Sequence, residues 1–362
     1  MRGILIKGNE NKAKYFIREV GGKKPVFICA IGSSEVGKIP GISAAGKNPE
    51  LTDYTPPADV ELLLYGRCKC IDSVPVTPEG IPTPALITMS ALELANIPIF
   101  IVAGGLRIKP HAPFIDLGGM HGGDIRKGLA VANVKEIMER AELIGKMFAK
   151  FSDYLVIGES MPGGTTTTLA ILLAMGIDAM GKVSSSMPNN PHNLKIKVVE
   201  EGMKAIGIKF GDFKNDPIKA ISHLGDPMIP AFSGLILGAG EEIPILMAGG
   251  TQMVAILAIV SAINNKVLKN LFIGTTRWLI EDKSSDLLGI VKQIHDLGIL
   301  IANLDFSTSK YEGLRMYEKG FVKEGVGAGG AAIAAILKSK GKITPKILLK
   351  RIEENYERLM NI

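Results

Sequence analysis

The chain has 362 residues, of which 46% are hydrophobic and 22% charged, so it can bury a large core and is not a disordered protein. The formal net charge is +6 and the pI about 9.0, yet the basic residues are scattered and their longest runs contain no aromatic residue. We therefore expect an anionic small-molecule partner and no nucleic acid. The three cysteines, Cys29, Cys68 and Cys70, argue against a disulfide framework and for a reducing, cytoplasmic location.

The amino-terminal stretch "MRGILIKGNENKAKYF" lacks the long apolar core of a signal peptide. Residues 243–263 carry no charged side chain and have membrane-spanning length, but a proline, a Gly-Gly pair and a glutamine interrupt them. For this segment we expect a short strand, a turn and a buried helix, and no membrane association. The histidines and cysteines lack the spacing of a metal site, so we expect no metal and no cofactor.

Short apolar runs alternate with longer helical patterns along the chain. These runs are apolar throughout, as strands covered on both faces must be, so we expect an α/β, Rossmann-like fold with a mostly parallel sheet and helices on both faces. Residues 32–58 and 66–84 are rich in Gly, Pro and Ser and are predicted to be long loops. The predicted strands cover residues 26–31, 60–65, 97–103, 154–158, 243–248, 271–275 and 299–304.

The carboxyl-terminal stretch "ITPKILLKRIEENYERLM" has Thr344 as a candidate N-cap and Pro345 at the first helical position. Its apolar residues fall on one face, which predicts a packing helix. We expect one large α/β domain over residues 20–340, with residues 1–19 and 341–362 as peripheral segments that form a small helical domain from the chain ends.

The segment "GESMPGGTTTT", residues 158–168, begins like a phosphate-binding P-loop. Gly164 stands where that motif has its lysine, so a nucleoside triphosphate would lose its main cationic partner. The following "TTTTLAILLAM" predicts a buried helix whose first turn, with its free backbone N–H groups and dipole, favours a phosphate. The alternative is a glycine turn needed only for the strand-to-helix geometry.

A second glycine cluster, "VKEGVGAGGAA", contains a literal dinucleotide-binding G-x-G-x-x-G pattern from Gly325 to Gly330. No convincing strand precedes it, and no strand follows that could supply the ribose-binding acid. Glu324 stands directly before this glycine turn. From its position alone, a solvated or helix-capping role for Glu324 is favoured over a catalytic one.

The two glycine-rich segments together resemble those of the nicotinate-nucleotide:dimethylbenzimidazole phosphoribosyltransferases, enzymes of cobalamin lower-ligand assembly. "GESMPGGTTTTLAILLAM" is similar to the family's Gly-Glu-Met-Gly-Ile-Gly-Asn-Thr-Thr segment, and "VKEGVGAGGAA" to its Leu-Gly-Glu-Gly-Thr-Gly-Ala segment. The resemblance covers residues 154–335 in the same order. The chain departs from the family at "VAGGLRIKPHAPF", which lacks the Asp-His pair, and at Ala248, where the family has Asp. These departures indicate a divergent, archaeal-type branch.

The resemblance implies transfer of the phosphoribosyl group of nicotinate mononucleotide to a benzimidazole-type or other purine-like base. Glu324 matches the family's catalytic glutamate, which takes the proton from the attacking base. Glu159 matches the glutamate of the first segment and would stabilise positive charge on the sugar. The resemblance also implies a homodimer. The predicted phosphate- and ribose-binding residues are Ser160, Gly163, Gly164, Thr165, Thr166, Gly249, Gly250, Gly325 and Gly327.

Three alternatives stay open from the sequence. A dinucleotide-dependent oxidoreductase depends on the Gly325–Gly330 pattern alone, and a P-loop NTPase lacks both the lysine and a convincing acidic metal ligand. A non-catalytic or differently specific nucleotide-binding protein is compatible with the altered amino-terminal signature.

Overall fold

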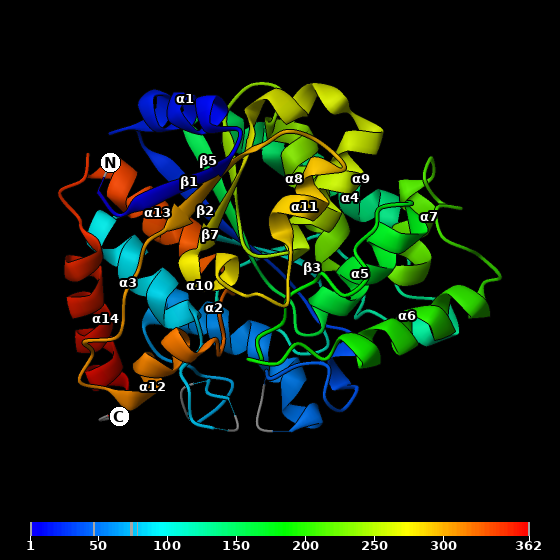
Figure 1. Ribbon diagram of the computed structural model, residues 1–362, viewed down its shortest axis with the longest axis horizontal. Helices are drawn as coiled ribbons and strands as arrows, with labels where there is room; N and C mark the ends of the chain where they lie inside the picture. Colours follow the sequence, from blue (N-terminus) through cyan, green and yellow to red (C-terminus); the bar gives the residue numbers. More distant parts are fainter. Residues whose placement is uncertain (1, 46–47, 73–74, 78, 361–362) are drawn as a thin grey trace.

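The strands form one eight-stranded sheet in the order β1-β8-β7-β6-β5-β2-β3-β4, and all neighbouring strands are parallel except β1 with β8. The computed structural model describes residues 2–45, 48–72, 75–77 and 79–360 (Figure 1). The predicted α/β fold with a mostly parallel sheet is confirmed. The strands are β1 (Ile4–Gly8), β2 (Pro25–Gly32), β3 (Ile99–Gly105), β4 (Ile115–Asp116), β5 (Tyr154–Ser160), β6 (Ile245–Ala248), β7 (Leu271–Thr276) and β8 (Gly298–Ala302).

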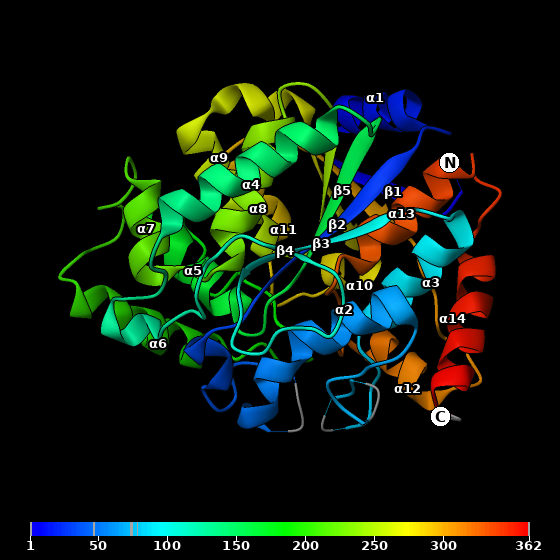
Figure 2. The same ribbon diagram turned by 180° about the vertical axis from the view of Figure 1, so that it is seen from behind.

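Two hydrophobic clusters lie on opposite faces of the sheet, because successive side chains of a strand point to opposite sides. In β2, Val26, Ile28 and Ala30 belong to one cluster, and Phe27 and Cys29 to the other. Figures 1 and 2 show the helices in two layers around the central sheet. The helices of the first layer are α4 (Val134–Ala149), α5 (Gly164–Ala174), α6 (His192–Ala205), α7 (Pro217–Leu224), α8 (Met228–Ala239), α9 (Gln252–Ile263) and α11 (Leu287–Lys292).

The second layer covers the opposite face and includes both ends of the described chain. Its carboxyl-terminal helix begins after Thr344, whose hydroxyl accepts a hydrogen bond from the Ile347 backbone N–H, as the sequence predicts. The division into a large domain over 20–340 and peripheral ends stays a prediction; β1 extends the sheet into the first of these end segments. The helices of this layer are α1 (Glu10–Val20), α2 (Thr55–Tyr65), α3 (Ala85–Ala95), α10 (Arg277–Ile280), α12 (Glu312–Arg315), α13 (Ala328–Lys338) and α14 (Pro345–Met360).

The strand expected over residues 60–65 is wrong, because this segment is the second half of helix α2. Pro56 and Pro57 lie in its first turn, and Gly66 follows its last residue in a left-handed conformation with φ 65°. Proline at the start and glycine just past the end are helix signals, and an apolar run this short fits a buried helix as well as a strand. The loops expected over 32–58 and 66–84 also contain 3₁₀ turns at Glu35–Lys38 and Pro49–Tyr54 and the start of α2.

The segment 243–263 forms strand β6, a Gly-Gly turn and the buried helix α9, as predicted. Among the helices of the described residues, none combines the length and the apolarity needed to cross a lipid bilayer.

The strand order reverses between β2 and β5. From β2 the chain builds outward to β3 and β4, and from β5 it builds in the other direction to β6, β7 and β8. Ligands of open α/β sheets bind outside the carboxyl ends of the strands at such a switch point. Glu159 and Ser160 are the last two residues of β5 and therefore lie where a ligand is expected.

Candidate active site

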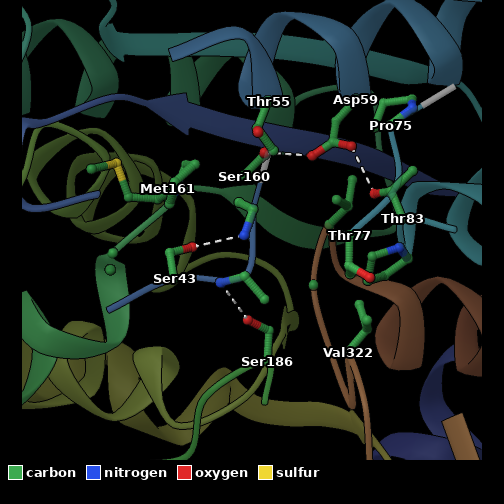
Figure 3. Close-up of a pocket in the computed structure, with 18 of the residues that line it drawn as sticks. Ser43, Thr55, Asp59, Pro75, Thr77, Thr83, Ser160, Met161, Ser186 and Val322 are labelled. Atoms are coloured by element: carbon green, nitrogen blue, oxygen red, sulfur yellow. Dashed lines mark hydrogen bonds between the residues drawn. The ribbon is translucent and has the colours of Figure 1, made fainter. Parts of the chain in front are cut away.

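A cavity of about 540 Å³ lies at the carboxyl end of β5 and of the strands beside it. Its walls come from the loops after β5 and β6, the start of α10, the loop before α13, and the segment between β2 and α3. Figure 3 shows side chains from these separate segments converging on the cavity. The volume lies in the range of small-molecule and cofactor sites, which is about 300–1,000 Å³.

Most of the predicted site residues line this cavity, although they come from distant parts of the chain. The ones that line it are Glu159, Ser160, Gly163, Gly164, Thr165, Gly250, Glu324 and Gly325. The three others lie behind it. Thr166 is fully buried, and the Gly249 N–H donates to the Gly274 carbonyl oxygen between neighbouring strand ends. Gly327, in the left-handed region at φ 69°, packs on the main chain of Gly158.

Glu324 is held at the carboxyl end of β7 and the start of α13. Its Oε2 accepts hydrogen bonds from the Thr276 N–H at 2.9 Å and from the Thr275 hydroxyl at 3.3 Å. Its Oε1 accepts from the N–H groups of Gly325 and Gly329, at 3.1 and 3.3 Å. Burial raises the pKa of Glu324 to about 7, against the opposing effect of these donors. A carboxyl group with this pKa suits a general base at neutral pH.

The glycines around Glu324 bring α13 unusually close to the sheet. A Cβ atom on Gly158 would lie 2.9 Å from the Gly327 Cα, and one on Gly330 would lie 2.2 Å from the Ala248 Cβ. The G-x-G-x-x-G pattern therefore serves helix packing in a context without a preceding strand, and does not form a dinucleotide-binding unit. The same packing explains Ala248, because a side chain as large as Asp would collide with α13.

Glu159 is buried near the end of β5. The side-chain amide of Gln252, at the start of α9, faces the Glu159 carboxylate and donates to it when its nitrogen is turned toward that carboxylate. Burial raises the pKa of Glu159 well above its usual range, and the negative charges of Asp226, Glu324 and Asp59 add to the effect. In the free protein this raised pKa favours the neutral, protonated acid, and a cationic group in the cavity would lower the pKa and stabilise the ionised carboxylate.

The first turn of α5 faces the cavity, as the "GESMPGG" segment predicts. Gly163 has φ 80° and directly precedes the helix, so the turn requires a glycine. Gly164 and Thr165 line the cavity, and Thr165 is the half-buried residue of this turn. Thr167, two residues further, is buried and donates to Asp226 at 2.5 Å. The helix is buried on all sides along its length, as predicted.

Three polar side chains in and around the site lie outside the sequence prediction: Asp59, Gln252 and Asp226. Asp59 accepts hydrogen bonds from the Ser160 hydroxyl at 2.7 Å and from the Thr83 hydroxyl at 2.8 Å (Figure 3). Burial raises the pKa of Asp59, and that of Asp226, to about 6. The signal available in the sequence for Asp59 is its place two residues after the proline pair of "TPPADVE", directly before the segment 60–65 that was predicted to be a strand.

Basic side chains are absent from the described lining of the cavity and stand instead behind its serine-rich wall, Ser184–Ser186. The Lys195 ammonium donates to the Ser184 carbonyl oxygen at 2.7 Å, and Lys323 pairs with Asp282 at 2.7 Å. Burial, followed by the nearby Lys323, lowers the pKa of Lys195 to about 7. Lys323 is balanced by Asp282 and Lys195 is only partly charged at neutral pH, so the excess positive charge behind this wall of hydroxyl groups is less than one unit, and an anion in the cavity would favour the charged form of Lys195.

Comparisons with known proteins agree with this architecture. A family model described as "Phosphoribosyltransferase" matches residues 125–277, which include Glu159 and the start of α5 and end before Glu324. A nicotinate-nucleotide-dimethylbenzimidazole phosphoribosyltransferase of Thermus thermophilus shares the fold, with a TM-score of 0.56 over 91% of both chains at 14% identity. The resemblance noted in the sequence is thereby confirmed.

Two curated relatives cover nearly the whole chain. A UPF0284 protein of Sulfurisphaera tokodaii is 48% identical over 93% of this chain and 94% of its own length. A UPF0284 protein of Methanopyrus kandleri is 44% identical over 99% of this chain and 94% of its own length. Because these similarities extend over both the conserved core of the fold and the divergent first 150 residues, the chain belongs to the UPF0284 family, an archaeal group with the fold of the nicotinate-nucleotide:dimethylbenzimidazole phosphoribosyltransferases.

Proposed function

We propose that the protein transfers the phosphoribosyl group of nicotinate mononucleotide to a benzimidazole-type or other purine-like base. The products are nicotinate and an α-riboside 5′-phosphate for the lower ligand of cobamides. The observation that carries the proposal is the convergence of Glu159 and Glu324 on one cavity that also contains the first turn of α5.

The leaving group requires no general acid. The bond between C1′ and the pyridinium nitrogen breaks, its electron pair returns to that nitrogen, and the ring leaves without a charge on it. Positive charge develops on C1′ and the ring oxygen of the ribose. Binding of the cationic nucleotide would favour the ionised form of Glu159, whose carboxylate would then stabilise this developing charge.

The incoming base supplies the electron pair of one ring nitrogen to C1′ from the opposite face, which inverts the β-nucleotide to an α-riboside. Its other ring nitrogen then loses a proton, and Glu324 would accept it. The phosphate does not react and serves only for binding. We place it between the first turn of α5 and the serine-rich wall, where Gly163, Gly164, Thr165 and the partial positive charge of the buried Lys195 favour an anion.

The runner-up is a nucleotide-binding protein without this activity. The purified protein is incubated with nicotinate mononucleotide and a panel of bases, and mass spectrometry detects the riboside phosphate. We expect a new riboside 5′-phosphate and an equal amount of nicotinate. Binding of nicotinate mononucleotide without product from any base would favour the runner-up instead.

By the same resemblance we propose a homodimer, which light scattering of the purified protein tests.

A further inference from the structure

The cavity has two chemically different ends. One end has hydroxyl and backbone groups from the start of α5 and the wall Ser184–Ser186. The other end is formed by the segment between β2 and α3 together with Val326 from the loop before α13. Its lining combines apolar side chains with the hydroxyl groups of Thr77 and Thr83, and the apolar ones are Ala58, Ile71, Pro75, Val76, Pro84 and Val326. A ribose phosphate matches the first end and a planar heteroaromatic ring the second, since flat apolar rings require apolar walls.

Asp59 is the buried acidic group at the apolar end, and the other acid there, Asp72, is exposed. The hydrogen bond of Asp59 from Thr83 places it beside Pro84, and the Thr83 N–H donates to the Pro75 carbonyl oxygen at 3.0 Å, which holds the segment 75–77 of the wall next to Thr83. Figure 3 shows Asp59, Thr83, Pro75 and Thr77 together on one side of the cavity. Asp59 lines the cavity and is only 2% exposed, so its carboxylate is largely removed from bulk water.

The carboxylate of Asp59 has unused accepting capacity. Each oxygen accepts one hydrogen bond from the protein, from Thr83 to Oδ1 and from Ser160 to Oδ2, and a carboxylate oxygen accepts about two. Both partners are neutral hydroxyls, and no Lys, Arg or His belongs to the described lining. A buried carboxylate with so little compensation favours a ligand that brings a further N–H or O–H donor.

We propose that Asp59 selects the acceptor base, and that the preferred bases carry an amino or hydroxyl donor on the ring edge remote from the attacking nitrogen. This inference deepens the proposed function and rests on it. The Ser160 hydroxyl donates a hydrogen bond to Asp59, and Ser160 directly follows Glu159 at the end of β5. The position of Asp59, which would hold the base, is therefore fixed relative to that of Glu159. Asp59 thereby both chooses the ring and orients it toward C1′.

The test uses two matched pairs of bases, adenine with purine and 5-aminobenzimidazole with benzimidazole. For each pair, kcat/KM is measured with saturating nicotinate mononucleotide, and the ratio of the amino base to its parent is compared between the native protein and Asp59→Leu. Differences in nucleophilicity between the bases are the same in both proteins and cancel. We expect the native ratio to exceed the variant ratio by roughly 10- to 100-fold, as for loss of a hydrogen bond to an ionised group.

Asp226→Asn is the matched control. Asp226 is also a fully buried aspartate with a hydroxyl partner and a pKa of about 6, but it does not line the cavity, so its loss should leave the ratios unchanged. If Asp59→Leu fails to fold, Asp59→Asn takes its place, with a smaller change in the same direction. Equal ratios in the native and Asp59 proteins would overturn the inference while leaving the transferase intact. Absence of transfer to every base would remove the proposed function and this inference with it.

Discussion

Glu159 and Glu324 line the same cavity but have opposite surroundings. Glu324 is fixed by four donors from β7 and from the start of α13, so its position is determined before any substrate binds. Glu159 faces the amide of Gln252, and the negative charges of Asp226, Glu324 and Asp59 add to the effect of burial on its pKa. A rigid carboxylate with a pKa near neutrality suits proton transfer, whereas a destabilised buried one suits attraction of a cation. Substitution of each by glutamine separates these roles.

Glu324→Gln should lower turnover with benzimidazole by roughly 10²- to 10⁴-fold, because the amide keeps the shape and cannot accept the proton. Turnover with 1-methylbenzimidazole should fall much less, since this base has no proton to lose. Steady-state rates with both acceptors give the comparison, and Glu312→Gln, an exposed glutamate of the same region, is the control. Equal losses with both acceptors would show that Glu324 is not the base.

The native pH profile tests the same role. Glu324 accepts a proton only when ionised, and its pKa is raised to about 7. The value of kcat/KM for benzimidazole should therefore fall as the pH drops below about 7, while that for 1-methylbenzimidazole should be much less affected.

Glu159→Gln should slow both acceptors alike, on the order of 10²-fold, because charge on the ribose develops whichever base attacks. The same two assays measure it. A loss limited to the proton-bearing acceptor would assign proton transfer to Glu159 and contradict the electrostatic role.

At the scale of elements, the first turn of α5 faces the cavity, and Gly163 and Gly164 at its start tolerate a side chain to different degrees. A Cβ on Gly163 would lie 2.7 Å from the Gly37 backbone nitrogen, so any substitution there strains the fold. A Cβ on Gly164 would meet the Gln252 side chain, which contacts Glu159. Thr165 lines the cavity without either constraint and is the better position for a test of the phosphate site.

Thr165→Asp should weaken nicotinate mononucleotide binding at least about tenfold, since a carboxylate would stand beside the proposed phosphate. Thr165→Asn has nearly the same shape without the charge and should bind far better. Isothermal titration calorimetry on both folded variants provides the dissociation constants. Unchanged affinity in Thr165→Asp would place the phosphate elsewhere in the cavity.

The sequence predicted the strands that are buried on both faces of the sheet. It did not predict the edge strand β1, and it gave a strand where the structure has the helix α2. β2, β5, β7 and β8 are continuous apolar runs and were predicted within a few residues. β1 was missed, because it is an edge strand in which only Ile4 is buried, so its apolar residues do not form the run typical of a covered strand. The error at 60–65 has the opposite cause, since a buried helix also gives an unbroken apolar run.

The candidate site was predictable where its residues lie next to glycine turns, as Glu159, Thr165 and Glu324 do. Asp59 and Gln252 could not be placed, because their role depends on tertiary contacts with Ser160 and with Glu159, which lie about a hundred residues away in the chain. Local patterns carry no information on which distant acid will be buried beside a strand end.

At the scale of the whole molecule, the site collects four acids with raised pKa values in one buried region. Asp59 and Asp226 have a pKa of about 6, Glu324 of about 7, and Glu159 well above its usual range, with burial as the main cause in each case. Between about pH 4 and 7 the folded protein therefore binds more protons at these groups than the unfolded chain does. At these four groups the free energy of unfolding therefore decreases as the pH rises through this window, whereas the acids with lowered pKa values, such as Glu61 and Asp282, act in the opposite direction mainly below about pH 5.

We expect the melting temperature without ligand to be higher at pH 5 than at pH 7, as measured by calorimetry. The lowered pKa values of His121 and His295 act in the opposite direction over the same window, but with two groups against four. Lys195 changes stability only above about pH 7. Asp226→Asn should reduce the difference between the two melting temperatures. A melting temperature that rises from pH 5 to pH 7 would show that the four buried acids do not control the pH dependence of stability.

The contact between Gly158 and Gly327 sets a dimension of the site that no side chain can adjust. Each glycine is within three residues of one of the two glutamates, and main chain meets main chain between them. The spacing between the main-chain positions of the two acids is therefore set by covalent bond lengths and by the packing of one backbone segment on the other. Substrates must fit this gap as it stands, and variation among bases has to be accommodated at the far end of the cavity, where the walls are side chains.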